Sequence, residues 1–331
     1  MAEQIVSPGV FTRENDQSFI TQQPVEVGGA LVGPTVLGPV EIPTIVTSYS
    51  EYQNKFGSTF VSGGRVYSHL TAISAYNYFQ NGGNTLLVTR VVTGSFTPAT
   101  ASIQGASNPA LKLKTISEGT IMNSESTLGA DGDLPNGTSD NVRWEVSFSD
   151  TGSGTFNLLI RQGNDLTNDK VVLETYAGVS LDPFQDNYIA KVIGDSSQKL
   201  LSDSDGNKYL QVTGSYPNKS NYVYVDEVLL PTPNFFNNTG SAASQAFKDS
   251  IPAVNSGSFG TATGGLFDPL TQALYNEQID TNTQGLIAEN YSDAFSLLTN
   301  NDEYQYNVIT APGLFHGISA HTGVLNTLIA N

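Results

Sequence analysis

A change of composition in the middle of the chain most constrains its fold. Residues 24–95 carry regular strand and helix patterns, whereas residues 96–140 are rich in Ser, Thr, Gly, Asn and Ala. Regular patterns of a third kind follow Gly264-Gly265. Because one hydrophobic core rarely grows beyond about 250–300 residues, a chain of 331 residues with these breaks is expected to fold as several units, one inserted in another.

We therefore predict an α+β multidomain fold, with a mixed α/β core interrupted by a β-rich insertion. Residues 1–23 are a polar, turn-prone leader, which is either a frayed terminus or a linking arm. Residues 24–95 form the first part of the α/β domain, and residues 96–265 form the insertion, with two subdomains split near residue 195 as one option. Residues 266–331 return to the core, which we expect to be incomplete at its C-terminus.

Hydrophobic periodicity predicts the elements of the core. The first part should contain strands at 25–33 and 41–47, helices at 48–56 and 65–80, and a strand at 85–92. The helix at 65–80 is predicted from Val66, Leu70, Ile73, Tyr76 and Phe79, which recur every three or four residues. The last part should contain helices at 271–277, 291–298 and 318–330 and a strand at 304–310.

The insertion shows strand patterns only after residue 140. Strands are expected at 142–148, 155–161, 170–176, 187–193 and 222–230, while residues 96–140 show little periodicity. Trp144 lies in an alternating strand, which favours a core position over a sugar platform. Asp203-Ser-Asp-Gly-Asn207 has its Gly at the wrong position for a calcium loop, so it is interpreted as a hairpin turn.

Charge and cysteine content exclude several classes of function. Fourteen basic residues against thirty-one acidic ones give a net charge of −17. Such a chain repels phosphate backbones and anionic lipid, so we expect no direct binding of nucleic acid and no membrane insertion. The absence of cysteine excludes disulfides, thiolate metal sites and thiol nucleophiles. The N-terminus lacks a secretion signal, which indicates a protein that stays in the cytosol.

No residues have the spacing expected of a catalytic, cofactor-binding or metal site. His69 has no carboxylate at a helical spacing, and His316 and His321 are five residues apart, which does not suit two ligands on one helix face. All three are interpreted as ordinary turn or surface histidines. We therefore predict a protein that is not an enzyme and needs no cofactor, although its many carboxylates leave a polysaccharide-active enzyme as an alternative.

Five stretches, taken together and in order, resemble one family. They are Ser7-Pro8-Gly9-Val10 followed by Glu14 and Asp16; Val32 to Val46 with Ser48 to Gly57; Asn81-Gly-Gly-Asn84 leading into Leu87 to Val92; Gly154 to Ile160 with Glu174-Thr-Tyr176, Ser180 to Pro183 and Asn187-Tyr188; and Asn307 to Gly313. Each alone is a weak signal. Their order along residues 7–313 is similar to that of contractile phage tail sheath proteins.

The resemblance implies a structural subunit of the contractile tail sheath of a bacteriophage. Such a subunit polymerises around the tail tube and contracts to drive the tube through the host cell envelope, and its inserted β-rich region protrudes. Residues Ser7, Pro8, Gly9, Val10, Glu14 and Asp16 would belong to an arm that links subunits. The implied partners are further copies in a helical homo-polymer, the inner tail tube protein, and the baseplate and tail terminator proteins. The protein would reside in the virion tail after assembly in the cytoplasm of the host bacterium.

Two other interpretations of the same sequence remain open. The chain could be the sheath of a phage-like contractile injection particle, which genomic neighbours would distinguish. It could also be a β-rich bacterial surface or adhesion protein, which would not form tubes. Sheath proteins usually continue beyond the position that corresponds to Asn331, with the rest of the core and a C-terminal arm. We therefore expect the C-terminal linkage to differ or to lie elsewhere.

Overall fold

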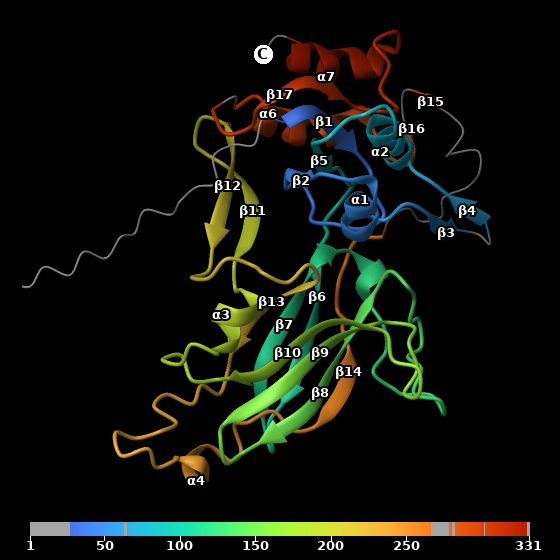
Figure 1. Cartoon of the computed structure of the whole chain (residues 1–331). Coiled ribbons are helices and arrows are strands. Elements are labelled where there is room, and N and C mark those ends of the chain that lie inside the picture. Colours follow the sequence, from blue (N-terminus) through green and yellow to red (C-terminus); the bar gives the residue numbers. More distant parts are fainter. Residues whose placement is uncertain (1–26, 63–64, 266–277, 280–281, 301, 330–331) are drawn as a thin grey trace, which may run out of the picture.

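The chain has an α+β multidomain fold, as predicted. The computed structural model describes residues 27–62, 65–265, 278–279, 282–300 and 302–329. Figure 1 shows a mixed α/β unit, with helices on both sides of one sheet, and a β-rich region beneath it. The N-terminal residues Ser7 to Asp16 and the predicted helix at 271–277 lie outside the described residues.

The sheet of the α/β unit is built from both ends of the described chain. Its strand order is β17-β1-β5-β2. Strand β1 (Val27–Gly33) lies parallel to β17 (Tyr306–Thr310) on one side and to β5 (Leu86–Arg90) on the other. Strand β2 (Thr44–Val46) is antiparallel to β5. Because β1 and β17 come from opposite ends of the chain, the β-rich region is an insertion between two parts of one sheet.

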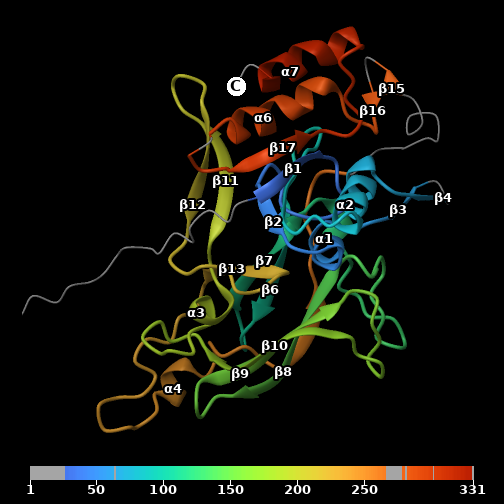
Figure 2. The same cartoon turned by 45° about the horizontal axis from the view of Figure 1, so that its top comes forward.

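Helices cover both faces of this sheet. Helices α1 (Tyr49–Phe56) and α2 (Leu70–Gln80) cover one face. The 3-10 turn η2 (Ala288–Tyr291) and helices α6 (Ser292–Leu298) and α7 (Ser319–Ile329) cover the other, as Figure 2 shows. Alternate residues of β1 supply the two cores: Leu31 faces α1 and α2, whereas Ala30 and Val32 face α6 and α7. All five residues of β5 are buried, as expected for a central strand covered on both faces.

Helix α1 forms where its local signals predict it. The hydroxyl of Ser48 accepts a hydrogen bond from the backbone N–H of Glu51 at 3.1 Å, which satisfies a donor that the helix itself leaves unpaired. Gly57, with φ of 70°, ends the helix because a left-handed residue cannot continue it.

The predicted helix at 65–80 is wrong over its first residues. Arg65–Tyr67 forms strand β4, which pairs with β3 (Phe60–Ser62), and the helix begins only at Leu70. The predicted apolar stripe is also wrong, since Ile73 and Tyr76 are 43% and 46% exposed. The buried residues of α2 are smaller: Thr71, Ala72 and Ala75.

Close packing of α2 on β1 explains this choice of small residues. An added Cβ at Gly33 would lie 2.5 Å from the Thr71 hydroxyl, so the strand and the helix backbone are unusually near each other. Large side chains cannot fit between them. The helix therefore turns its larger apolar residues away from the sheet.

Two antiparallel sheets form the β-rich region. One has the order β13-β7-β6 and the other the order β10-β9-β8-β14. They share one buried core, so they pack face to face as a sandwich. The bounds are β6 (Pro98–Gln104), β7 (Pro109–Glu118), β8 (Val142–Asp150), β9 (Thr155–Gln162), β10 (Val172–Ser180), β13 (Val223–Val228) and β14 (Asn255–Ser258).

The strands predicted at 142–148, 155–161, 170–176 and 222–230 are confirmed as β8, β9, β10 and β13. Trp144 is 5% exposed in β8, which confirms its core position. Strands β6 and β7 were missed in the stretch judged aperiodic. In β6 two of the buried positions are the small residues Ala99 and Ala101, which give a weak hydrophobic signal. Strand β7 buries Leu111 and Leu113 in alternation with Lys112 and Lys114, a pattern that does predict a strand.

The strand predicted at 187–193 is wrong, because the chain forms helix α3 (Ile189–Ile193) there. Ile189, Ala190 and Ile193 are buried, a spacing of one and four residues that places all three on one helical face. A short apolar run of this kind does not distinguish strand from helix by periodicity alone.

A two-stranded ribbon leaves the sandwich and runs upward beside α6 (Figure 1). It consists of β11 (Ser197–Ser202) and β12 (Lys208–Thr213), which pair antiparallel. At its turn the Asp203 carboxylate accepts hydrogen bonds from the backbone N–H groups of Asp205 and Asn207, at 2.9 and 2.8 Å. The predicted hairpin turn is thereby confirmed.

The remaining predictions in the core are mostly confirmed. The helices at 291–298 and 318–330 are α6 and α7, and the strand at 304–310 is β17. Short elements complete the described chain: η1 (Thr120–Met122), α4 (Ser244–Phe247), β15 (Gln278–Ile279) and β16 (Asn282–Thr283). In the described part of the chain, no helix has the length and apolar character needed to cross a membrane.

Candidate functional site: the neck and the open sheet edge

The two units are joined by a pair of chain crossings, residues 91–97 and 259–265, which we call the neck. The crossings are bonded to each other and to the top of the sandwich. The N–H of Thr97 donates to the carbonyl of Thr263 at 3.1 Å, and the N–H of Thr120 donates to the carbonyl of Gly264 at 2.8 Å. Main-chain pairing of this kind makes the connection a short ribbon rather than two independent linkers.

Arg90 is the last residue of β5 and directly precedes the first crossing, and its side chain lies at the centre of the neck. It is 0% exposed. Its Nη1 donates to the carbonyl oxygens of Gly38 at 2.6 Å and of Glu118 at 2.9 Å. Glu118 ends β7 of the sandwich, whereas Gly38 lies in the α/β unit. One guanidinium therefore ties the backbones of both units together.

Phe96 packs against the same guanidinium. The Arg90 Cζ lies 5.2 Å from the centre of the Phe96 ring, within the range of a cation–π contact. Added Cβ atoms at Gly264 and Gly119 would lie 2.4 and 3.0 Å from ring atoms of Phe96. Both glycines have positive φ, 94° and 110°. Only glycine allows the backbone this conformation and this approach to the ring without strain.

Burial shifts the pKa values of the ionisable groups around the neck. Burial lowers the pKa of Arg90 to about 10, so the guanidinium stays charged at neutral pH. Burial raises the pKa of the Glu118 carboxyl to about 7; the Arg90 cation opposes this rise and Glu41 adds to it. Burial, followed by the Arg90 cation, lowers the pKa of His69 to about 3. His69 is thus neutral, and the positive charge in the neck is that of Arg90.

The β11–β12 ribbon makes a second connection between the units. Lys208 Nζ lies 3.0 Å from Asp293 Oδ2 of α6. Leu200 and Leu210, which are directly opposite in the ribbon, pack on the core beneath α6 and α7. The sandwich is therefore held to the α/β unit at the neck and, farther out, by this ribbon.

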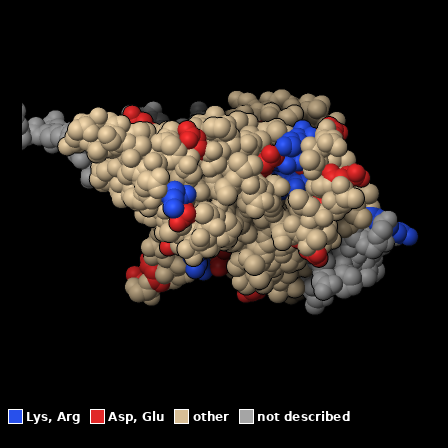
Figure 3. Space-filling view, turned by 90° about the horizontal axis from the view of Figure 1, so that it is seen from below, with Lys and Arg blue, Asp and Glu red and all other residues tan. Residues whose placement is uncertain are grey.

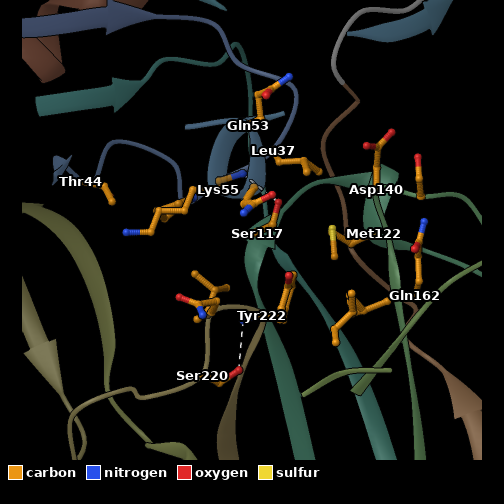
Figure 4. A pocket seen from close by; sticks show the side chains of 18 of the residues that line it. Leu37, Thr44, Gln53, Lys55, Ser117, Met122, Asp140, Gln162, Ser220 and Tyr222 are labelled. Atoms are coloured by element: carbon orange, nitrogen blue, oxygen red, sulfur yellow. Dashed lines mark hydrogen bonds between the residues drawn. The ribbon is translucent and has the colours of Figure 1, made fainter. Parts of the chain in front are cut away.

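Cavities lie between the two units. One, of about 470 Å³, is lined by Leu37, Thr44, Gln53 and Lys55 from the α/β unit and by Ser117, Met122, Asp140 and Tyr222 from the insertion. Figure 4 shows the two groups facing each other. Burial raises the pKa of the Asp140 carboxyl. A second cavity of about 360 Å³ lies beside the base of the ribbon. The interface between the units thus combines buried contacts, such as those of Val36 and Leu37 with the sandwich core, with open cavities.

The α/β sheet also presents an open edge. Among the described residues β17 pairs only with β1. Val308, in the middle of β17, is 64% exposed. An edge strand of this kind presents unpaired main-chain groups that can accept another strand.

No metal site is found: in the described ranges, no group of three or more His, Cys, Asp or Glu residues is arranged to hold an ion. The histidines were predicted to be turn or surface residues; His69 and His321 are both 0% exposed, so neither is at the surface. His69 precedes α2 and stacks on Phe60, and the His321 Nδ1 accepts a hydrogen bond from the Phe315 N–H at 3.1 Å.

Sequence reasoning did not identify the neck. The predicted arm residues Ser7, Pro8, Gly9, Val10, Glu14 and Asp16 lie outside the described residues, so their role stays a prediction. Arg90 was assigned only to a strand. Its signal was available, since a single charge in the otherwise uncharged run Thr85 to Val92 requires a buried partner.

No protein-family profile matches the sequence, and no curated protein does. Among solved structures, the chain is similar to a sheath tail protein from Listeria innocua, with a TM-score of 0.39 and 12% identity, over 92% of this chain and 44% of that one. It is also similar to a sheath tail protein from Desulfitobacterium hafniense, with a TM-score of 0.27 and 12% identity, over 94% of this chain and 55% of that one. The chain thus spans about half the length of the two solved structures. At these scores the likeness is partial and concerns only the arrangement of elements.

Proposed function

We propose that this chain is a structural subunit of the contractile tail sheath of a bacteriophage. Many copies would form a helical tube around the inner tail tube, and contraction of this tube would drive the tail tube through the host cell envelope. Further partners would be the baseplate and tail terminator proteins. The protein would act in the virion tail after assembly in the host cytoplasm, and without touching DNA directly.

The observation that carries the proposal is the open edge of the α/β sheet. A strand that pairs with β17 would gain main-chain hydrogen bonds without needing a core of its own. The polar leader, residues 1–23, contains the first stretch that resembles tail sheath proteins. We infer that the leader of one copy, including Ser7 to Val10, Glu14 and Asp16, pairs with a neighbouring copy. Such tethers keep copies together while their other contacts change, because they maintain a high effective concentration.

The neck supports a mechanical role for the subunit. A sheath subunit has to keep its shape while its neighbours move, so its units need a firm connection. Arg90 bonds to both units at 2.6 and 2.9 Å, and the sandwich would follow the α/β unit as it moves. The sandwich would be the protruding region and the α/β unit the part that lies in the tube wall.

The proposal is tested by polymer formation. We expect the purified full-length chain to form tubes or short sheath-like cylinders in negative-stain electron microscopy. Deletion of residues 1–20 should abolish these polymers and leave a monomer with an unchanged circular dichroism spectrum and melting temperature. Strictly monomeric particles of the full-length chain at all concentrations would overturn the proposal. Unfolding of the truncated monomer would show that the leader belongs to the subunit's own core, and the proposed linkage would then be wrong.

A further inference from the structure

The two sheets of the sandwich leave a groove along one seam. The edge strands β6 and β14 lie beside each other there but do not pair. They are joined at both ends of the seam: Thr100 and Gly260 exchange two main-chain hydrogen bonds of 2.8 and 3.0 Å, and the N–H of Ala253 donates to the carbonyl of Gln104 at 3.1 Å. Between these points lies a groove of about 560 Å³, within the usual range of small-ligand sites. We call it the seam groove.

Main-chain groups of β6 face the seam groove. In an antiparallel pair, alternate residues direct their N–H and C=O groups away from the partner strand. Thr100 directs both groups away from β7, since both bond to Gly260. Ser102 follows two residues later in the same unbroken register with β7, so its N–H and C=O face the seam as well. The groove therefore offers a backbone donor and a backbone acceptor in addition to its side chains.

The indole of Trp144 forms part of the groove wall. Trp144 lies directly opposite Gly257 in the β8–β14 pair. An added Cβ at Gly257 would lie 2.8 Å from Cζ2 and 3.1 Å from Nε1 of Trp144, so the N–H edge of the ring lies over β14. Trp144 is 5% exposed and lines the groove, yet within the described part of the chain its indole N–H has no hydrogen-bond partner. Buried indole N–H groups usually have one, and a ligand in the groove can supply it.

Uncharged polar side chains line the seam groove. Among the described residues no Asp, Glu, Lys, Arg or His lines it, and its polar side chains include Ser102, Gln104, Asn255, Ser256 and Ser258. Uncharged residues also cover most of the face in Figure 3, which shows the molecule from the end where the sandwich lies in Figure 1. Hydroxyl and amide groups both donate and accept hydrogen bonds. The lining therefore suits an uncharged ligand whose own groups donate and accept as well.

We propose that the seam groove binds a neutral glycan, with one sugar oxygen accepting from the Trp144 indole and others bonded to Ser102 and Gln104. A peptide strand fits less well. Inserted between β6 and β14 it would need about 9.5 Å, twice the spacing of paired strands, whereas the two chain segments are bonded directly at both ends of the seam. This binding goes beyond the proposed function and does not depend on it. In a tail sheath the protruding sandwich would present the groove to polysaccharide of the host surface.

Tryptophan fluorescence and calorimetry test the proposal in the full-length chain. Trp144 is the only tryptophan, so a ligand in the groove should shift its emission. The probes are neutral trisaccharides of glucose, galactose, mannose and N-acetylglucosamine, of which at least one should bind with a Kd of about 1 mM or below. Trigalacturonate, the acidic counterpart of the galactose trimer, should bind about tenfold more weakly or not at all, because the chain has a net charge of −17.

Variants locate the binding in the groove. Ser102→Arg places a long charged side chain there and should weaken binding by about tenfold or more. Ser202→Arg is the matched control, because Ser202 is also an exposed strand residue but lies in β11, outside the groove; it should have little effect. Gln104→Ala and Trp144→Phe each remove one hydrogen-bonding group and should weaken binding by about two- to tenfold.

Calorimetry measures binding by all variants, since Trp144→Phe has no tryptophan, and melting curves confirm that each variant is folded. The proposal is overturned if none of the neutral trisaccharides binds, or if folded Ser102→Arg or Trp144→Phe chains bind them as tightly as the unaltered chain. Binding of an uncharged Gly-Ser hexapeptide in place of the trisaccharides would make the groove a peptide site and would also overturn it. The tail sheath proposal is decided separately, by polymer formation, and does not depend on these outcomes.

Discussion

Replacement of Arg90 by Met should weaken both the stability of the chain and the coupling of its two units. The substitution removes the guanidinium and retains most of the aliphatic volume. It removes the donor that bonds the carbonyl oxygens of Gly38 and Glu118 at 2.6 and 2.9 Å, although Gly38 still accepts from the Glu118 N–H at 3.3 Å. The unpaired Glu118 carbonyl costs about 1–3 kcal/mol, the lost bond at Gly38 about 0.5–1.5 kcal/mol, and the lost contact with Phe96 about 0.5–2 kcal/mol.

An opposing contribution reduces this sum. Arg90 is a fully buried charge, and its removal gives back part of the free energy spent on desolvation. We therefore expect a net loss of about 2–4 kcal/mol in the free energy of unfolding. The substitution should mainly weaken the coupling between the two units, because the lost hydrogen bonds join one unit to the other.

Urea unfolding with two probes measures both effects. Trp144 is the only tryptophan of the chain and lies in the core of the sandwich, so its fluorescence reports on that unit. Far-ultraviolet circular dichroism reports on both units. In Arg90→Met the two transitions should separate, with the α/β unit unfolding at lower urea than the sandwich.

Arg143→Met is the matched control. Arg143 is 1% exposed and donates to the Gly132 carbonyl at 2.7 Å, but its hydrogen-bond and ion-pair partners, Gly132 and Asp165, lie within the sandwich region. This variant should lower the urea concentration at the midpoint of the fluorescence transition, because it destabilises the sandwich itself. Surface substitutions usually change the free energy of unfolding by no more than about 0.5 kcal/mol. If Arg90→Met changes it by no more than this, and its two unfolding transitions coincide, the role assigned to the neck is refuted.

Two further predictions concern the neck. Because folding raises the pKa of Glu118 from 4.5 to about 7, its contribution to stability is present below pH 4.5 and is lost as the pH rises to about 7. The stability of the unaltered chain relative to Glu118→Gln should therefore fall between pH 4.5 and 7 in urea titrations, and a flat difference would contradict this. Gly264→Ala should destabilise by about 1–3 kcal/mol more than Gly240→Ala, because both glycines have positive φ, 94° and 79°, but only a Cβ at Gly264 would strike the Phe96 ring. Equal melting temperatures for these two variants would show that the contact with Phe96 is not restrictive.

Part of this fold could be predicted because its signals are local. The alternation in β8 and β9, the turn at Asp203 and the helix stop at Gly57 each depend on residues within one or two turns of chain. Such patterns hold regardless of what packs nearby. The breaks in composition, together with the strand and helix periodicities, likewise predicted an α+β fold with an insertion.

Other features depended on partners that lie far away in sequence. The helix predicted from Arg65 onward was shortened because the first residues pair with Phe60–Ser62. Ile73 and Tyr76 turned outward because α2 had to lie close to the glycines of β1. Strand β6 carries the small residues Ala99 and Ala101, whose burial comes from the facing sheet.

The sequence by itself determined the class of fold, most of the regular elements and the strongly acidic balance of the chain. These features depend on hydrophobic periodicity, turn residues and charge, which are all properties of residues close together in the sequence. Only the tertiary structure decided that β17 lies beside β1 and that Arg90 joins two units. The physical reason is that burial and strand pairing depend on contacts between segments far apart in the sequence, and local sequence patterns do not specify those contacts.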